Sequence, residues 1–265
     1  MRLVSFDGGF GRLEGDTVIP MGPELAGYLG GSPAAEKSAR PLAGLRILAP
    51  LTRPEKIICV GLNYRDHAAE SGQPIPDEPI IFAKFANSII GPGAPIRLPL
   101  LAPKCVDYEA ELAVVIGRPC SRVPVSRAMD YVGGYTCAND VSARDLQSRG
   151  GQWVHGKAID SFLPLGPCLV TPDEIGDPQA LGIRCVINGV SMQDSNTSLM
   201  IFGVAELISF ISQTISLSPG DVISTGTPPG VGSARKPPRY LAVGDEVTIS
   251  IDVIGDLRNP VEVQV

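Results

Sequence analysis

The chain has 265 residues, of which 44% are hydrophobic and 19% are charged, and its formal net charge is −6. These values suit one large globular domain, or one domain with a small appendage, and the lack of a basic excess argues against a nucleic-acid partner. No stretch approaches the roughly 18 uninterrupted apolar residues of a membrane span, and the N-terminus has no apolar signal core. We therefore expect a soluble, cytoplasmic protein that does not bind membranes.

The cysteines are spread along the chain without a CxxC pair or a metal-ligand spacing. The six positions are Cys59, Cys105, Cys120, Cys137, Cys168 and Cys185. Several lie inside apolar runs such as "IICVG". The sequence therefore predicts buried free thiols in a reducing compartment rather than a disulfide framework.

The N-terminal segment "MRLVSFDGGFGRLEGDTVIP" has two alternating apolar runs around a glycine turn, which predicts a β-hairpin. The small-residue stretch "GGSPAAEKSARP" that follows is typical of a surface connection. We predict a small N-terminal β appendage over residues 1–50 and a main domain over residues 51–265.

The main domain alternates short apolar strands with glycine and proline turns. The expected strands are Lys56–Val60, Ile80–Lys84, Leu112–Ile116, Val132–Ala138, Leu181–Ile187, Val222–Thr225 and Glu246–Ile254. One helix is expected in "MIFGVAELISFISQTI", where apolar residues recur at helical spacing. A second is expected in "NDVSARDLQ", with Asp140 or Ser142 as its N-cap. The pattern predicts a β-rich α+β fold with few helices.

The segment "GLNYRDHAAESGQPIPDEP" places His67 three residues before Glu70, on one face of a helical turn. A carboxylate bonded to an imidazole raises its basicity and fixes its tautomer, as a general base requires. The alternative is an exposed helical pair without a catalytic role. The glycine and proline residues that follow suggest a mobile lid. The other histidine, His155, has no carboxylate at a similar spacing and is expected to be structural.

The stretch "VDYEAELAVVIG" opens with acids and continues as a strand that is apolar on both faces. In an extended strand Glu109 and Glu111 point the same way. On an edge strand they would simply face water, but in a central strand each would cost several kcal/mol or take up a proton. A divalent cation resolves the conflict, and the absence of nearby histidine or cysteine indicates Mg²⁺, Mn²⁺ or Ca²⁺ rather than zinc.

A third metal ligand is offered by Asp140, at the point where an apolar strand ends, although this aspartate could equally be an N-cap. Arg144 and Gln147 follow at four and seven residues and are expected to share a helical face with Asp140. An arginine beside an acidic metal centre can hold a substrate carboxylate with two hydrogen bonds.

Two further polar side chains lie later in the chain. Lys157, in "QWVHGKAID", could neutralise an enolate or a carboxylate, or it could be a surface lysine. The glycine loop "STGTPPGVG" can offer backbone N–H groups and the Thr227 hydroxyl to an oxyanion.

Over residues 56 to 255 or so, the chain resembles the fumarylacetoacetate hydrolase family. The motifs that carry the resemblance are "GLNYRDHAAE", "PIIFAKFANSIIGP", "VDYEAELAVVIG", "MDYVGGYTCANDVSARDLQ", "GKAIDSFLPLGP", "INGVSMQDSNTSLMIF" and "LSPGDVISTGTPPGVG". One departure is "GKAID" where many relatives have "GKSFD", so that Ala158 offers no hydroxyl.

The resemblance implies a mixed β-sandwich roll, usually a homodimer, with one Mg²⁺, Mn²⁺ or Ca²⁺ per subunit. The family's metal ligands fall on Glu109, Glu111 and Asp140. Its catalytic residues fall on His67 and Glu70, in the lid, and on Lys157. Its substrate pocket falls on Arg144, Gln147 and Thr227, and on Lys84 in "FAKFANS".

A 2-oxo acid can chelate one hard ion through its carboxylate and ketone, and the ion can then stabilise an enolate. Our first expectation is a metal-dependent hydrolase that cleaves the C–C bond of a 2,4-dioxo acid (an acylpyruvate) through a metal-bound enolate, with His67 activating water. The alternatives are an isomerase, tautomerase or decarboxylase that acts on a 2-oxo diacid or a 2-hydroxydienoate, such as oxaloacetate or a hydroxymuconate. A non-catalytic, ligand-binding family member is a more remote alternative, because no metal or dyad position is missing.

Overall fold

The strand that contains the acid pair lies in the interior of a large mixed sheet. In the computed structural model, which describes residues 1–264, β11 (Ala110–Ile116) is buried along its whole length. It pairs antiparallel with β12 (Val132–Asn139) on one side and with β17 (Val222–Ser224) on the other. A strand with neighbours on both edges and apolar residues on both faces must be covered above and below, which explains the continuous run "LAVVI".

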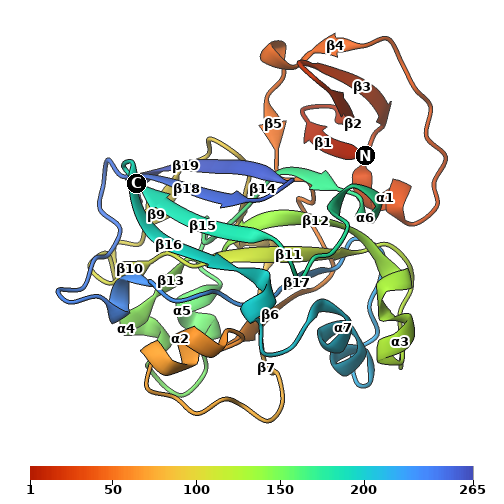
Figure 1. Cartoon of the computed structure of the whole chain (residues 1–265). Coiled ribbons are helices and arrows are strands. Elements are labelled where there is room, and N and C mark those ends of the chain that lie inside the picture. The colour runs from red at the N-terminus through yellow and green to blue at the C-terminus, as the bar shows by residue number, and fades with distance from the viewer. Residues whose placement is uncertain (265) are drawn as a thin grey trace.

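The large sheet continues in both directions from this centre (Figure 1). Its order is β4 (Arg40–Pro41), β3 (Thr17–Gly22), β2 (Gly9–Glu14), β1 (Arg2–Phe6), β14 (Leu163–Val170), β12, β11, β17, β6 (Ile57–Gly61) and β7 (Ile80–Lys84). Two short strands join at the sides, β5 (Ile47–Leu48) beside β1 and β8 (Ile89–Ile90) beside β14. Most neighbours are antiparallel, whereas β17 and β6 run parallel.

The N-terminal strands are tied to the main sheet by backbone pairing. β1 pairs antiparallel with β14, Arg2 opposite Val170 and Leu3 opposite Leu169. In Figure 1 the strands β2 to β4 project beyond the rest of the sheet. The segment predicted as an appendage over residues 1–50 is therefore a β structure that extends the large sheet through β1.

A second sheet covers β11 and β12. It consists, in order, of β16 (Val190–Asn196), β15 (Gly182–Ile187), β18 (Glu246–Ile251), β19 (Gly255–Val263) and β9 (Ile96–Leu98). Alternate residues of β15 and β18, such as Ile183, Cys185 and Ile249, are buried in the same core as Leu112 and Val114 of β11. The predicted β-rich sandwich with few helices is confirmed. The strand predicted over Glu246–Ile254 ends earlier, because residues 252–254 form the turn into β19.

The longest helix is α7 (Val204–Ser212), which buries Val204, Leu207, Ile208 and Ile211 as the helical spacing predicts. The other α-helices are single turns or little more. They are α1 (Leu25–Leu29), α2 (Arg65–Glu70), α3 (Val125–Ala128), α4 (Arg144–Gln147), α5 (Val154–Lys157) and α6 (Pro172–Ile175). α2, α4 and α5 lie together at the lower left of Figure 1, beneath the ends of β10 (Val106–Asp107) and β13 (Ser142–Ala143).

The predicted N-cap for the second helix was wrong. Ser142 belongs to β13, which pairs with β10, so α4 begins at Arg144 after Ala143, and no side chain caps it. Asp140 lies before β13 and is not part of the helix. Arg144 and Gln147 share α4 with each other but not with Asp140, because Val141 and the two residues of β13 lie between Asp140 and the helix.

The cysteines and the helices bear on the predicted free thiols and on the predicted lack of a membrane span. The six cysteines are free, and all except the half-buried Cys105 are buried. Within residues 1–264, no helix combines the length and apolar character that crossing a membrane requires.

Candidate active site

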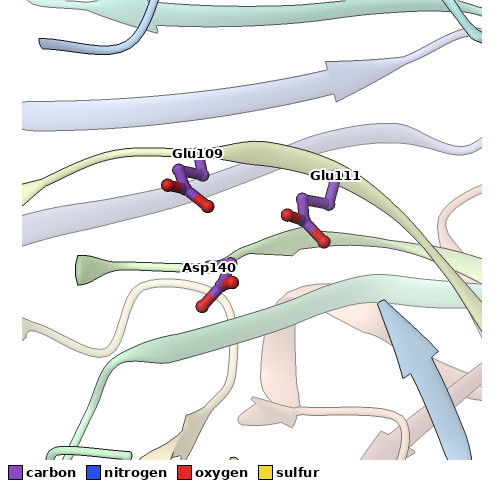
Figure 2. A group of neighbouring side chains, drawn as sticks. All are labelled: Glu109, Glu111 and Asp140. Carbon is purple, nitrogen blue, oxygen red and sulfur yellow. The ribbon is translucent and has the colours of Figure 1, made fainter. Parts of the chain in front are cut away.

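Three acidic side chains from two neighbouring strand ends meet in the interior. Glu109 precedes β11, Glu111 lies within it, and Asp140 follows β12. The antiparallel register places Glu111 opposite Ala138, and the Asp140 N–H donates to the Glu109 carbonyl at 2.9 Å. Carboxylate oxygens of the three residues lie within 4.8 Å of one another. Figure 2 shows Glu109 and Glu111 projecting from the same side of the β11 chain, as the alternation of a strand predicts.

The environment of these acids fits a divalent cation. Burial, followed by the carboxylates of Asp140 and Glu109, raises the pKa of Glu111 well above its usual range. No well-aligned hydrogen bond reaches Asp140 Oδ1, although Lys84 Nζ lies 2.8 Å away. Three buried carboxylates that repel one another offer only oxygen ligands, which hard ions such as Mg²⁺ and Mn²⁺ prefer. Glu109, Glu111 and Asp140 could therefore hold a divalent metal ion.

Lys157 lies between two of the acids. Its Nζ is 2.7 Å from Glu109 Oε2 and 2.7 Å from Asp140 Oδ2. Burial alone would lower the pKa of Lys157, but the Asp140 and Glu109 carboxylates outweigh burial and raise it. The lysine is therefore a fixed positive charge at the floor of the site, and it is not available as a base near neutral pH.

Arg144 contributes a second cation on the other side of Glu109. Its Nη2 lies 2.7 Å from Glu109 Oε1 and 2.8 Å from Asp107 Oδ2, and its Nη1 donates to Gln147 Oε1 at 3.0 Å. The pKa of Glu109 is lowered because Lys157 and Arg144 together outweigh the opposing effect of burial. With its oxygen engaged by Arg144, Gln147 keeps its NH₂ group for a ligand.

Asp107 is a site residue to which the sequence analysis gave no role. It is fully buried, and it accepts hydrogen bonds from Gly232 N at 2.7 Å and Ser233 N at 2.9 Å. Through Arg144 and these two amides, Asp107 joins α4 to the glycine loop. Its position two residues before Glu109 indicated that it would point to the same side of the chain. Only the fold shows that Asp107 binds Arg144 and the amides of the glycine loop.

Lys84 lies behind Asp140 rather than on a cavity wall. Its ammonium donates to the carbonyl oxygens of Val141 at 3.0 Å and Phe162 at 2.8 Å, and also to that of Lys157. Burial lowers the pKa of Lys84, although Asp140 opposes the shift. The structure thus places Lys84 as a support for Asp140, and the sequence prediction of a substrate contact has no support from its position.

A cavity of about 380 Å³ opens above the acids. Its lining residues are Val60, Gly61, Leu62, His67, Ser71, Gln73, Ile80, Phe82, Glu109, Glu111, Arg144, Gln147, Trp153, Lys157 and Thr227. All sequence-predicted site residues except Glu70, Asp140 and Lys84 are in this set, and each of these three contacts one of its members. His155 is exposed and outside the cavity.

One wall of the cavity is apolar and tightly packed. The rings of Phe82 and Trp153 meet edge-on, with centroids 5.3 Å apart. A Cβ on Gly61 would lie 2.4 Å from the Trp153 ring, so only glycine at position 61 allows the indole to take this place. The Lys157 ammonium lies 5.1 Å from the centre of the Phe82 ring.

His67 also lines the cavity, and it pairs with Glu70. His67 Nδ1 lies 2.9 Å from Glu70 Oε2, and Glu70 Oε1 accepts a hydrogen bond from Gly230 N at 2.9 Å. Glu70 therefore connects α2 to the glycine loop while it orients the imidazole. This bond occupies Nδ1, so Nε2 is the nitrogen left to exchange a proton with a ligand or water.

Metal binding is expected to release protons and to strengthen with rising pH. The raised pKa of Glu111 means that the metal-free site holds a proton that a cation must displace. Raising the pH removes this competing proton, so the apparent Mg²⁺ affinity increases with pH until Glu111 is fully ionised. Isothermal titration calorimetry in two buffers of different ionisation enthalpy measures the release. Affinity that stays constant between about pH 6 and 9 would contradict this interpretation.

The β-rich sandwich thus brings together three buried carboxylates that could hold a divalent cation, a lysine between two of them and a His–Glu pair. The family model for the fumarylacetoacetate (FAA) hydrolase C-terminal domain matches residues 56–262. The chain belongs to the fumarylacetoacetate hydrolase family, as the motifs predicted.

Within this family, the chain is similar to proteins named as tautomerases, isomerases and hydrolases. The chain is 54% identical over 221 residues to the mitochondrial oxaloacetate tautomerase fahd2 of Xenopus laevis, a match that covers 83% of this chain and 69% of that protein. It superimposes on 2-hydroxyhepta-2,4-diene-1,7-dioate isomerase from Mycobacterium marinum with a TM-score of 0.84 and 40% identity, over 99% of this chain and 97% of that one. It also matches the fumarylacetoacetate hydrolase of Exiguobacterium antarcticum with a TM-score of 0.88 and 34% identity, over all of both chains.

Proposed function

We propose that this protein is a divalent-metal-dependent tautomerase or isomerase that interconverts the enol and keto forms of a small 2-oxo acid, with oxaloacetate as the first candidate substrate. The observation that carries the proposal is the buried Glu109–Glu111–Asp140 cluster at the floor of the cavity. The names of the tautomerase and isomerase relatives favour this reaction over C–C hydrolysis, which was the first expectation from the sequence.

The protein's own residues supply the remaining requirements of enol–keto exchange. When bound by the three carboxylates, a Mg²⁺ or Mn²⁺ ion supplies Lewis-acid stabilisation of negative charge on the ligand's oxygens. Lys157 adds a fixed positive charge at the same floor, and Gln147 and Thr227 offer polar groups to ligand oxygens. The phenyl and indole rings give the cavity one apolar wall.

Proton transfer is the chemical event in tautomerisation. A proton leaves C3 of the keto acid while another is gained at the C2 oxygen, and the reverse occurs on return. We assign this proton transfer to His67 Nε2, because Glu70 occupies the other ring nitrogen. Solvent can also carry this proton once the negative charge is stabilised, so the demand on His67 is modest.

Hydrolysis of an acylpyruvate is the second candidate, and the His67–Glu70 contact favours it. Water must attack the C4 carbonyl in this reaction, and a base polarised by a carboxylate suits that step. The bond between C3 and C4 then breaks, and the electron pair stays on C3 until it is protonated. Decarboxylation of a 2-oxo diacid would use the same charge stabilisation without a base for water.

The deciding experiment assays three reactions in parallel with Mg²⁺ and with Mn²⁺. These are loss of the ultraviolet absorbance of enol-oxaloacetate, cleavage of an acylpyruvate, and release of pyruvate from oxaloacetate. We expect metal-dependent acceleration of the first reaction, abolished by EDTA and restored by added metal. Cleavage or pyruvate release without any effect on enol loss would instead assign the protein to the hydrolase or decarboxylase alternative.

Our proposals for the oligomeric state and the cellular location rest on the family resemblance and on the chain's composition. We propose a homodimer in the cytoplasm that uses Mg²⁺ or Mn²⁺, with Ca²⁺ as a further possibility for the ion. Mass determination in dilute solution tests the dimer, and a monomeric mass would contradict it.

A further inference from the structure

Gln193 is a buried glutamine that contacts two parts of the site without lining the cavity. It lies on β16 of the second sheet and is 1% exposed. Its Oε1 accepts a hydrogen bond from Ala110 N at 2.9 Å, between the two glutamates of the acid pair. Its Nε2 donates to Thr227 Oγ1 at 2.9 Å and to the Pro228 carbonyl at 2.7 Å. The side chain therefore joins the start of β11 to the glycine loop.

These partners allow the Gln193 amide only one orientation. The Ala110 N–H is a donor and requires the amide oxygen, whereas the Pro228 carbonyl is an acceptor and requires the NH₂ group. A flipped amide would place two donors together at Ala110 and two acceptors together at Pro228, in a side chain that is buried from bulk solvent. The NH₂ group must therefore face Thr227.

The fixed amide in turn determines what Thr227 can do. The Thr227 oxygen accepts from Gln193, and within residues 1–264 no acceptor takes the proton of that hydroxyl. Thr227 is 4% exposed and lines the cavity, so the proton is free to point toward a ligand. Without Gln193, the Thr227 oxygen would lose the hydrogen bond that holds it within residues 1–264.

We infer that Gln193 is a positioning residue, which holds the Thr227 oxygen so that its hydroxyl proton is available to an anionic oxygen of the ligand. The inference rests on the proposed function, because it requires a 2-oxo acid to occupy the cavity. It adds that the ligand presents a hydrogen-bond acceptor, such as a carboxylate or enolate oxygen, to the Thr227 hydroxyl. It also adds a residue of the second sheet to those that determine ligand affinity.

The test measures binding rather than turnover. Pyruvate, the simplest 2-oxo acid, is titrated calorimetrically into the full chain loaded with Mg²⁺, for the wild type, Gln193→Met, Thr227→Val and the double variant. Each single change should raise the pyruvate Kd about 10-fold or more, the usual cost of a lost hydrogen bond to a charged group. In the Thr227→Val background, Gln193→Met should add less than about a factor of 2, because the interaction it supports is already absent.

Gln179→Met is the matched control. Gln179 likewise bridges backbone groups, the Thr197 carbonyl at 3.0 Å and Val204 N at 2.8 Å, but neither of these partners lines the cavity. This variant should leave the pyruvate Kd unchanged. Gln193→Glu is a second variant in case Gln193→Met fails to fold, since its carboxylate keeps an acceptor for Ala110 N–H and loses the donor to Thr227.

Two results would overturn the inference. One is an unchanged Kd in a folded Gln193 variant, and the other is an equal loss with and without the Thr227 hydroxyl, which would show that Gln193 acts through β11 alone. If the wild type itself binds no pyruvate in the presence of Mg²⁺, the proposed function fails and the inference fails with it. The binding behaviour of the wild type therefore distinguishes the two failures.

Discussion

Replacing Glu111 by glutamine is expected to abolish Mg²⁺ binding and to lower metal-dependent activity at least ~10³-fold, since Lewis-acid stabilisation contributes several kcal/mol to such reactions. The same change should stabilise the metal-free protein at neutral pH. The raised pKa of Glu111 means that ionising this group opposes folding above its unfolded-state pKa, and a neutral amide removes that cost. Calorimetry with Mg²⁺ and thermal unfolding with and without Mg²⁺ measure both effects.

Glu262→Gln, an exposed position on β19, is the matched control and should behave as the wild type. Added Mg²⁺ should raise the melting temperature of the wild type and of this control but not that of Glu111→Gln. Unchanged turnover of the wild type after EDTA treatment and dialysis would remove the basis of the metal hypothesis.

Removing the imidazole of His67 should separate the two candidate chemistries. His67→Ala is expected to slow C–C cleavage of an acylpyruvate by ~10²–10⁴-fold, because water attack needs a positioned base. Enol–keto conversion of oxaloacetate should fall much less, since solvent can exchange the proton once negative charge is stabilised. The measurement is a pair of initial rates on one enzyme preparation, normalised to bound metal.

His155→Ala serves as the control for loss of a histidine, because His155 is exposed and does not line the cavity. Glu70→Gln should reproduce much of the cleavage defect, since an amide no longer stabilises the imidazolium. Cleavage that survives in His67→Ala at close to the wild-type rate would show that the pair has a structural role, with Glu70 joining α2 to Gly230.

The acid pair was predictable because its placement depends only on residues that are neighbours in the sequence. Strand alternation places Glu109 and Glu111 on one side, and the apolar run after them makes the strand central, whatever the rest of the fold. His67 and Glu70 were predictable in the same way, from spacing within one helical turn. The family motifs then added Asp140, which spacing alone could not distinguish from a helix cap.

The supporting residues could not be predicted because their roles depend on contacts distant in sequence. Gln193 meets Thr227 across 34 positions, and Arg144 meets Asp107 across 37. A buried lysine such as Lys84 carries no local signal of whether it faces a ligand or a set of carbonyl groups. The N-cap error at Asp140 has a similar cause, because the pairing of β13 with β10 overrode a good local capping sequence.

The apolar wall has a consequence for how the protein can be observed. Trp153 is the only tryptophan in the chain, and its ring lies on the cavity wall against Phe82. All tryptophan emission therefore arises at the site, and ligand entry can be followed in real time without a label. The same emission, compared with far-ultraviolet circular dichroism during unfolding, reports whether the cavity opens before the sheets separate, since two-state unfolding requires the two transitions to coincide.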